Sequence, residues 1–157
     1  MVDLFAGAGG LSVGLEKAGF NCLYANEVSG SYSDTLKENH PESLVQTQDI
    51  RSVDAAKVRR TLQISRGDLH LLAGGPPCQG FSINAPIRSK GDERNHLFLE
   101  FLRFVDEFKP KAVLIENVPG MVSLEKGETV HAIISSLNEK GYDASVRILF
   151  AAHYGVP

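Results

Sequence analysis

The sequence predicts an α/β fold in which a mostly parallel sheet lies between two layers of helices. Short apolar runs recur along the chain without alternating polar and apolar residues, a pattern typical of strands buried on both faces. Segments with helical apolar spacing stand between these runs. Because strand, crossover and strand follow one another repeatedly, the sheet should be parallel, with helices on both of its faces.

Six strands are expected, at the runs richest in β-branched and large apolar residues. In chain order they are VDLF at 2–5, NCLYANE at 21–27, LVQT at 44–47, LHLLAGG at 69–75, KAVLIENV at 111–118 and ASVRILF at 144–150.

Five helices are expected between the strands, at 11–19, 30–41, 53–63, 96–110 and 127–141. The first ends at Gly19 and the last at Gly141, and glycine favours helix termination. The second stops before Pro41 and the fourth before Pro110, since proline cannot continue a helix. The fourth also has large apolar residues at helical spacing, which predicts one buried face.

Length and composition are those of one globular domain over residues 1–157, with 43% hydrophobic and 22% charged residues. This composition excludes a disordered chain. No apolar stretch approaches the roughly 20 residues that cross a bilayer. The chain starts with an acid and glycines where a secretion signal would have basic and then apolar residues. We therefore expect a cytoplasmic protein without membrane contact.

The cysteines and charges exclude further classes. Two cysteines, Cys22 and Cys78, are too few for a disulfide framework or a four-thiol zinc site, and the five histidines show no paired spacing, so no metal is expected. The net charge of −3 argues against a protein that holds nucleic acid by electrostatics alone. A protein with this net charge can still carry a local basic patch.

Function is expected at the carboxyl ends of the strands, where such sheets bind ligands. After the first strand, Gly7, Gly9 and Gly10 permit a tight turn and close approach of backbone N–H groups to a ligand. The dinucleotide fingerprint G-x-G-x-x-G is not met, because Ser12 stands at its third glycine. Glu27 ends the second strand, where such folds bind a ribose, and Asp49 follows the third, where a carboxylate could accept from an adenine amino group. The turn and the two acids predict a pocket for an adenosine-bearing cofactor.

Two further strand ends carry reactive groups. Cys78 follows a Pro-Pro turn at a site that should be partly exposed and ringed by N–H groups, conditions that lower the pKa of a thiol and favour a nucleophile. Glu116 directly follows the apolar run AVLI, where a carboxylate is costly to bury unless it is paired or protonated. A thiol and an acid beside an adenosine pocket suggest group transfer onto an electrophilic ring, whereas hydride transfer needs neither.

With these residues in view, the sequence resembles the DNA cytosine carbon-5 methyltransferases, which use S-adenosylmethionine. The matching motifs, in the family's order, are DLFAGAGGLSVGLEKAGF, NE, QDI, GGPPCQGFS and ENVPG, and the final YGVP resembles the start of a later motif. The resemblance implies the three-layer, Rossmann-like methyltransferase fold. It also implies double-stranded DNA as a partner and a role in restriction-modification or epigenetic methylation, with nucleoid association if the source is bacterial.

The resemblance also implies residue roles. Phe5, Gly7, Gly9, Gly10 and Leu11 would line the methionine side of the cofactor; Glu27 would bind the ribose hydroxyls, Asp49 and Ile50 the adenine, and Leu97 would touch the cofactor. Val28 belongs to the same pocket but stands where many relatives have an aromatic residue. Pro77, counted with this pocket, would contact the target base.

The implied reaction is covalent. The Cys78 thiolate adds to carbon 6 of a flipped-out cytosine, Glu116 hydrogen-bonds ring nitrogen 3 and the exocyclic amine, and carbon 5 takes the methyl group. Gln79 and Ser82 of the same motif would contact the substrate. The polar segment 83–96 reads as a mobile loop with Gly91 as a hinge. Its Arg88, Lys90 and Arg94 would meet DNA phosphates.

The sequence departs from the family at its end. Phe150 replaces a common asparagine, and Pro157 precedes the glutamine and arginines, the further strand, the target-recognition region and the last cofactor motif that relatives have. The edge of 111–118 would then be unpaired, and 144–150 would lack its neighbour. We therefore expect a fragment, one part of a split enzyme that needs a second chain, or an incomplete relic.

Three alternatives stay open. A non-catalytic module would bind S-adenosylmethionine but form no covalent complex with DNA. A transferase for tRNA would use the same machinery, although GGPPCQGFS is closer to the DNA branch. A nicotinamide oxidoreductase is disfavoured by Ser12 and by a cysteine and a glutamate that it would not use.

Overall fold

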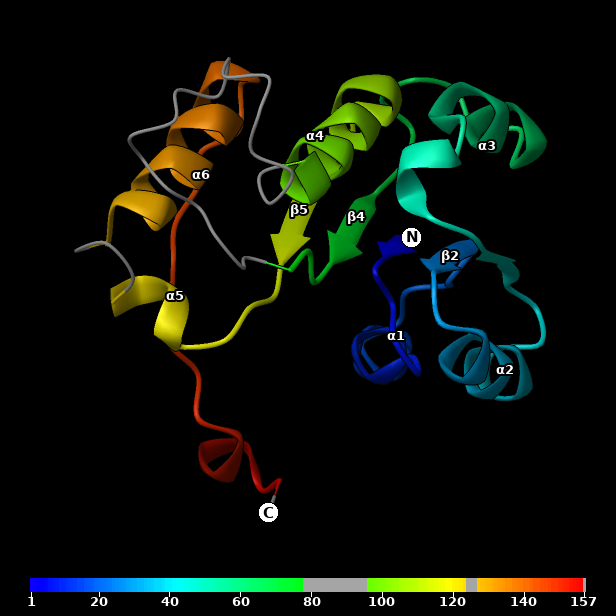
Figure 1. Ribbon diagram of the computed structural model, residues 1–157, viewed down its shortest axis with the longest axis horizontal. Coiled ribbons are helices and arrows are strands. Elements are labelled where there is room, and N and C mark those ends of the chain that lie inside the picture. The colour runs from blue at the N-terminus through cyan, green and yellow to red at the C-terminus, as the bar shows by residue number, and fades with distance from the viewer. Residues whose placement is uncertain (78–95, 124–126, 157) are drawn as a thin grey trace. The chain divides into compact units, whose positions relative to one another are not determined.

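Five parallel strands form one sheet in the order β3-β2-β1-β4-β5. The strands are β1 (Val2–Leu4), β2 (Tyr24–Glu27), β3 (Leu44–Thr47), β4 (Leu71–Gly74) and β5 (Ala112–Ile115). The computed structural model describes residues 1–77, 96–123 and 127–156 (Figure 1). The chain adds β2 and β3 on one side of β1 and then returns to place β4 on the other side. The strand order therefore reverses between β1 and β4, which is where a ligand site is expected in such a sheet.

The helices follow the sequence pattern. They are α1 (Gly10–Lys17), α2 (Gly30–Asn39), the 3-10 helix η1 (Ile50–Ser52), α3 (Ala55–Thr61), α4 (His96–Phe108), α5 (Gly120–Ser123), α6 (Glu128–Glu139) and the 3-10 helix η4 (Ala151–Tyr154). The five expected helices are confirmed as α1, α2, α3, α4 and α6. The short α5, η1 and η4 were not expected, because one turn is too short to show a period.

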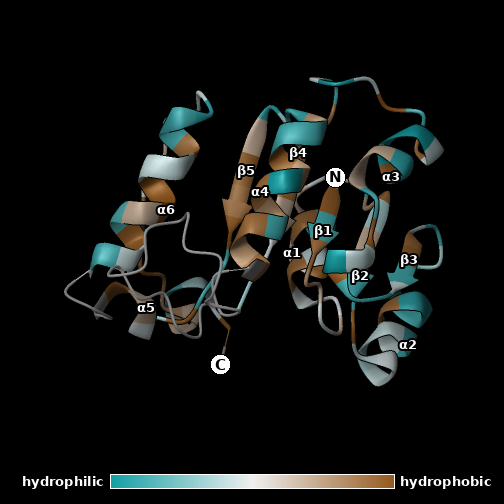
Figure 2. Cartoon of the chain, turned by 45° about the horizontal axis from the view of Figure 1, so that its top comes forward, coloured by the Kyte–Doolittle hydropathy of each residue, from teal (hydrophilic) through white to brown (hydrophobic). Residues whose placement is uncertain are grey.

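Helices cover both faces of the sheet, as expected (Figure 1). On one face, Ala25 and Ala73 belong to a cluster against which Leu11 and Leu15 of α1 pack. On the other face, a Cβ added to Gly74 would lie 2.3 Å from the Leu4 carbonyl oxygen and 3.1 Å from the Phe101 ring of α4. The small residue at Gly74 therefore lets α4 lie close to the sheet. In Figure 2 the strands β4 and β5 are coloured as hydrophobic, whereas α2 is mostly polar.

Two expectations about the strands need correction. The inner strands β1, β2 and β4 are buried along their whole length, but β3 and β5 are partly exposed because they form the edges of the sheet. The sixth expected strand is wrong: residues 144–150 have no strand assignment. A strand needs a partner for its N–H and C=O groups, and no described strand pairs with this segment. Its Ile148, Leu149 and Phe150 are exposed.

The described residues fall into two compact units. One contains residues 1–77 and 96–117, which carry the sheet and α1 to α4. The other contains 118–123 and 127–156, which carry α5, α6 and η4. In the described parts of the chain, no helix has the length and apolar character needed to span a membrane.

Candidate functional site

Two cavities lie at the carboxyl ends of the strands, in the unit that carries the sheet. The Glu27–Asp49 cavity has a volume of about 230 Å³ and is lined by Phe5, Asn26, Glu27, Val28, Asp49, Ile50, Arg51, Pro77 and Leu97. The Asp3–Glu116 cavity has a volume of about 270 Å³ and is lined by Asp3, Phe5, Ala6, Leu11, Gly75 and Glu116. Phe5 belongs to both walls. The two cavities therefore adjoin at the point where the strand order reverses.

The turn between β1 and α1 has an unusual backbone. Phe5 has a φ of 58°, in the left-handed region that side chains other than glycine rarely adopt. The Ala6 amide next to it donates to the Asn26 carbonyl oxygen at 3.0 Å, which holds the turn against β2. Gly9, with a φ of 94°, closes the turn by donating to the Ala6 carbonyl. Backbone strain at a residue that lines two cavities is typical of a ligand site.

Glu27 ties this turn to the next helix. It is only 8% exposed, and its two carboxylate oxygens accept from different amides: Gly7 N at 2.9 Å and Ser29 N at 2.8 Å. Each oxygen has a second lone pair, so the carboxylate can still accept from hydroxyl groups in the cavity. With this geometry, Glu27 can order the glycine turn and at the same time accept hydrogen bonds from the two hydroxyl groups of a diol.

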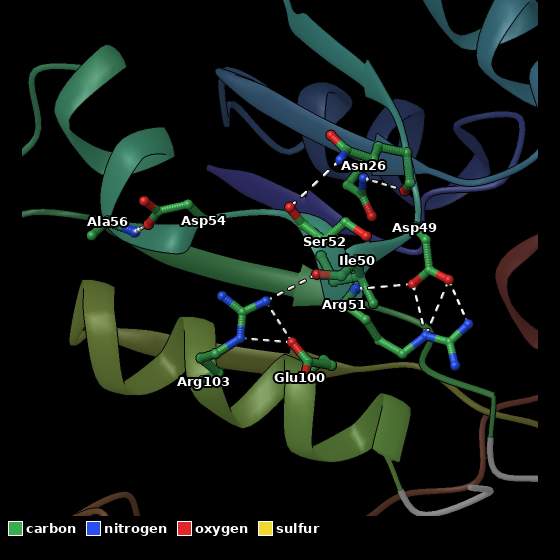
Figure 3. A network of polar contacts seen from close by, with 10 residues as sticks. Asn26, Asp49, Ile50, Arg51, Ser52, Asp54, Ala56, Glu100 and Arg103 are labelled. Atoms are coloured by element: carbon green, nitrogen blue, oxygen red, sulfur yellow. Dashed lines mark hydrogen bonds and ion pairs between the residues drawn. The ribbon is translucent and has the colours of Figure 1, made fainter.

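Asp49 forms an ion pair with Arg51 at the rim of the same cavity (Figure 3). Its carboxylate accepts from the Arg51 amide at 2.9 Å, from Nε at 3.0 Å and from Nη2 at 2.5 Å. These hydrogen bonds from the Arg51 side chain and backbone lower the pKa of Asp49 to about 2. Asp49 is therefore ionised at any physiological pH and acts only as a hydrogen-bond acceptor.

Asn26 fixes the chain segment that leads to Asp49. The side chain is 2% exposed, and its Nδ2 donates to the carbonyl oxygens of Gln46 at 3.1 Å and Gln48 at 2.9 Å. Both donor positions of the amide are thus used across the ends of β2 and β3. The buried Asn26 side chain therefore fixes the course of the backbone from β3 to Asp49.

Asp3 is a buried carboxylate in the middle of β1. It is 0% exposed; Oδ2 accepts from the Ser12 hydroxyl at 2.6 Å, whereas Oδ1 has no hydrogen-bond partner among the described residues. Burial raises the pKa of Asp3 to about 6, against the Ser12 hydrogen bond, which lowers it. A buried acid with an unused oxygen is costly, and a cationic or hydrogen-bond-donating ligand in the cavity would offset that cost.

Glu116 lies across the same cavity, directly after β5. A Cβ added to Gly75 would lie 3.3 Å from Glu116 Oε2, so the glycine leaves room for the carboxylate against the end of β4. The next residue, Asn117, donates from Nδ2 to the Pro76 carbonyl oxygen at 2.8 Å. The ends of β4 and β5 are therefore tied together immediately before Cys78.

The structure brings most of the expected cofactor residues together. Those that line one of the two cavities are Phe5, Leu11, Glu27, Val28, Asp49, Ile50, Pro77 and Leu97. Gly7, Gly9 and Gly10 do not line a cavity wall but shape the turn beside them. Val28 is 68% exposed, as expected for a loosely covered side of the pocket. Contact of any of these residues with a cofactor remains a prediction.

The residues expected to act on the substrate are mostly not described. Cys78, Gln79, Ser82, Arg88, Lys90 and Arg94 lie outside the described residues. Glu116 is the one expected reactive side chain that the structure describes, and its role also remains a prediction.

Three lining residues with polar side chains received no role from the sequence: Asp3, Asn26 and Arg51. The position of Asp3 within the apolar run VDLF was a usable signal, because a charge buried in a strand costs free energy unless an interaction compensates for it. Asn26 and Arg51 gave no such signal. The backbone partners of Asn26 lie 20 and 22 residues away, and Arg51, although only two residues from Asp49, has the residue type of an ordinary surface position.

The donor set fits an adenosyl cofactor with a cationic end. Glu27 and Asp49 offer acceptors for hydroxyl and amino groups in one cavity. Asp3, whose Oδ1 has no hydrogen-bond partner among the described residues, lines the other cavity and could place a negative charge beside a cation. In the described part of the chain, His, Cys, Asp and Glu side chains form no group of three that could hold a metal ion.

Comparison with known proteins gives a consistent picture. The family model for C-5 cytosine-specific DNA methylases matches residues 1–157. The Type II methyltransferase M.AgeI of Thalassovita gelatinovora is 44% identical over 156 residues, which cover 99% of this chain and 36% of that protein. M.DdeI of Desulfomicrobium norvegicum is 41% identical over 160 residues, which cover 100% of this chain and 37% of that protein. The chain thus spans little more than a third of the length of these relatives.

Solved structures agree at the level of the fold. A protein assigned as a DNA modification methyltransferase encoded within a prophage (E. coli) superposes with a TM-score of 0.69 at 33% identity, over 88% of this chain and 37% of that one. The Dnmt2 methyltransferase of S. pombe gives a TM-score of 0.59 at 24% identity, over 85% of this chain and 40% of that one, which concerns the fold alone.

Proposed function

The chain belongs to the family of C-5 cytosine-specific DNA methylases, and we propose that it carries the cofactor site and the reactive residues for methyl transfer from S-adenosylmethionine to carbon 5 of cytosine in DNA. The observation that carries the proposal is the pair of adjoining cavities whose walls hold Asp3, Glu27, Asp49 and Glu116. Because the chain spans 36% of M.AgeI, we propose the activity for this chain together with the regions that such relatives have in addition, in the same polypeptide or a second one.

The adenosine part of the cofactor would occupy the Glu27–Asp49 cavity. Glu27 would accept from the ribose hydroxyls with the lone pairs that Gly7 and Ser29 leave unused. Asp49 would accept from the adenine amino group, and the buried Ile50 would pack against the ring. Val28 and Leu97 complete the apolar part of this wall.

The methionine part would extend past Phe5 into the Asp3–Glu116 cavity, beside Leu11. The cofactor, when bound, supplies an electrophilic methyl group on a cationic sulfur. The unused oxygen of Asp3 supports this orientation, because a buried carboxylate favours the cationic end of a ligand over a neutral one.

The chain's own reactive groups would act on the cytosine. The Cys78 thiolate would add to carbon 6, and the ring electrons would move toward carbon 5, which makes that carbon nucleophilic enough to take a methyl group. A base would then remove the carbon 5 proton, and the bond from sulfur to carbon 6 would break and release the thiolate. The electron pair of the broken carbon 5–hydrogen bond would restore the ring double bond, and the pair of the carbon–sulfur bond would return to Cys78, which regenerates the thiolate. The proton would leave with the base, and the pair that had bonded the methyl group would stay on the cofactor.

Glu116 would stabilise charge during the addition. Placed at the end of β5, it would hydrogen-bond ring nitrogen 3 and the exocyclic amine of the base. Pro77, which lines the cofactor cavity, would contact the same base. Pro77 and Glu116 follow the neighbouring strands β4 and β5, which supports a base site between the ends of these two strands.

Double-stranded DNA would have to present the cytosine flipped out of the helix, because a stacked base exposes neither face to the thiolate. Gln79 and Ser82 would contact the base or its neighbours, and Arg88, Lys90 and Arg94 would meet phosphates. The names of the relatives, Type II methyltransferases, support a restriction-modification setting, with epigenetic methylation as the other setting for the same reaction.

A DNA duplex with 5-fluorocytosine at the target tests the reaction. Fluorine cannot leave carbon 5 as a proton does, so the thiolate cannot be eliminated and the protein stays attached to the DNA. The chain, completed by the regions that its relatives add, should give a covalent band on a denaturing gel when S-adenosylmethionine is present, and Cys78→Ser should abolish the band.

The 157 residues alone should form no adduct, because a net charge of −3 gives little affinity for DNA without further contacts. If they form it unaided, the chain needs no further region. If the completed protein binds cofactor but traps nothing, it is a non-catalytic binding module, and if it traps tRNA but not DNA, the substrate is wrong.

A further inference from the structure

Helix α4 is connected to the Glu27–Asp49 cavity by a side chain that does not line it. Arg103, in the second half of α4, donates from Nη2 to the Ile50 carbonyl oxygen at 2.9 Å and from Nε to Glu100 Oε2 at 2.6 Å (Figure 3). Ile50 begins η1, 53 residues away along the chain. This contact joins the helix on one face of the sheet to the turn that carries Asp49.

The turn itself does not need Arg103. Within η1, the Ser52 amide donates to the Asp49 carbonyl at 2.9 Å and the Val53 amide to the Ile50 carbonyl at 3.1 Å. The Ile50 oxygen therefore accepts one bond from its own turn and a second one from α4. Removal of Arg103 should leave the turn closed but no longer fixed to the helix.

Arg103 is held in one direction by its surroundings. Glu100 lies one turn earlier on α4, forms an ion pair with it and is only 22% exposed. The guanidinium lies 5.1 Å from the centroid of the Phe104 ring, and Phe104 is fully buried. A planar guanidinium between a carboxylate and an aromatic ring keeps its orientation better than a lysine could.

The same helix also supplies Leu97, which lines the cavity opposite Asp49 and Ile50. One end of α4 thus forms part of the wall, and Arg103 sets the distance from α4 to another part of it. We propose that Arg103 is a positioning residue for the adenosine side of the cofactor site, which rests on the proposed function. It acts through Ile50 and its neighbour Asp49, and it touches neither cofactor nor substrate.

The test compares Arg103→Met, Arg103→Lys and Arg59→Met in the chain completed by the regions that its relatives add, with the dissociation constant for S-adenosylmethionine measured by calorimetry. Arg59 is the matched control, because it joins α3 to α4 through Glu107 at 2.6 Å and donates to the Ile64 carbonyl at 3.0 Å, and it lines neither cavity. Arg103→Met should weaken binding roughly three- to tenfold, which is less than the loss of a direct hydrogen bond from a charged group, because Arg103 acts on the cofactor only through Ile50 and Asp49. Arg103→Lys should recover part of this loss, since its ammonium can replace one of the two bonds.

A purely structural role predicts a different result. Arg103→Met and Arg59→Met would then lower the thermal unfolding midpoint alike and leave the dissociation constant unchanged in both. Amide exchange of Ser52 and Val53 should stay slow in Arg103→Met if the turn remains closed.

Different results would contradict the proposed cofactor and the proposed role of Arg103. If the unchanged protein binds no S-adenosylmethionine, the proposed cofactor is wrong. If Glu27→Ala weakens binding and Arg103→Met does not, the positioning role is wrong and the cofactor site stands. Should Arg103→Met fail to fold, Arg103→Lys and Glu100→Gln decide the matter: binding equal to that of the unchanged protein in both overturns the role of Arg103.

Discussion

Two aspartates that line the cavities show how their environments give chemically identical side chains different pKa values. Burial raises the pKa of Asp3 to about 6, because the charged form loses its hydration inside the sheet. Hydrogen bonds from Arg51 lower the pKa of Asp49 to about 2, at a position open to solvent. Asp49 is therefore a constant acceptor, whereas the charge of Asp3 changes near neutral pH and responds to what occupies its cavity.

Glu27→Ala tests the ribose contact. The change removes the acceptor for the cofactor hydroxyls and the bonds to Gly7 and Ser29, so S-adenosylmethionine should bind more weakly by roughly 1.5 to 3 kcal/mol. Calorimetry measures the loss, and Glu27→Gln, which keeps one oxygen acceptor, should lose less. Binding of NAD as tight as that of S-adenosylmethionine would contradict the assignment of this pocket.

Asp3→Asn tests the buried acid through its effect on stability. Because the folded-state pKa of about 6 lies above the ordinary 3.8, the folded protein holds this proton more tightly than the unfolded chain does. The contribution of Asp3 to the free energy of unfolding therefore falls as pH rises from about 4 to about 6 and stays unfavourable above that window. Denaturant unfolding near pH 8 without cofactor should find Asp3→Asn more stable by roughly 1 to 3 kcal/mol.

Near pH 3 the gain should be close to zero, because Asp3 is then mostly protonated in both states. The exposed Asp68→Asn is the control and should change little at either pH. A loss of stability of equal size at both pH values would show that the Ser12 hydrogen bond matters more than the charge. At pH 8 the same Asp3→Asn variant should also bind S-adenosylmethionine less tightly, so that stability and cofactor binding change in opposite directions.

At the scale of elements, the turn between β1 and α1 also determines how two helices pack. Gly9 combines a φ of 94° with close neighbours: an added Cβ would lie 2.7 Å from Leu36 Cδ1 and 2.8 Å from His40 Nε2. His40 is buried and pairs with Glu16 of α1 at 2.9 Å. The glycine therefore lets α1 and α2 pack together beneath the turn.

Gly9→Ala should destabilise the fold by roughly 2 to 4 kcal/mol, since the left-handed conformation and the steric overlap both act against it. Gly14→Ala is the matched control within α1, where an added Cβ meets nothing within 4 Å, and it should stabilise by about 0.5 to 1 kcal/mol. Urea unfolding of both variants checks the pair. Equal effects would mean that the contacts with Leu36 and His40 relax without cost.

At the scale of the whole molecule, every residue that lines the two cavities lies in the unit that carries the sheet. Among the described residues, the unit with α5 and α6 contributes none of them. A bound ligand makes local opening less favourable in the segments that hold it, and it has less effect on segments that open independently. Cofactor binding should therefore affect the two units unequally.

Hydrogen exchange with and without saturating S-adenosylmethionine tests this. Amides of residues 5–7, 27–29 and 49–53 should exchange at least about tenfold more slowly with ligand, while those of α6 should exchange at an unchanged rate. The uncharged analogue S-adenosylhomocysteine serves as the comparison and should protect the same segments. Equal protection of α6 would show that the units open together.

The sequence by itself determined the layout of this protein. Unbroken apolar runs separated by helical patterns are local properties, so the five parallel strands, the five main helices and the functional end of the sheet could all be predicted. The positions of Glu27, Asp49 and Glu116 could be predicted in the same way, because each lies at the end of a strand or just after it, which is where a parallel sheet places a ligand. Asp3 could have been noticed on the same grounds, as an acid within a buried run.

Only the tertiary structure decided which strands lie at the edges and which contacts complete the site. The run at 144–150 has the composition of a strand but no described partner, and pairing is a property of two segments. Asn26, Arg51 and Arg103 act on backbone carbonyls or on a neighbouring carboxylate, and their residue types alone are those of ordinary polar surface positions. The roles of Asn26 and Arg103 follow from distances between segments far apart in the chain, and those distances exist only once the fold has brought β2, β3 and α4 together. Arg51 lies two residues from its partner Asp49, so only its place in a cavity wall needed the tertiary structure.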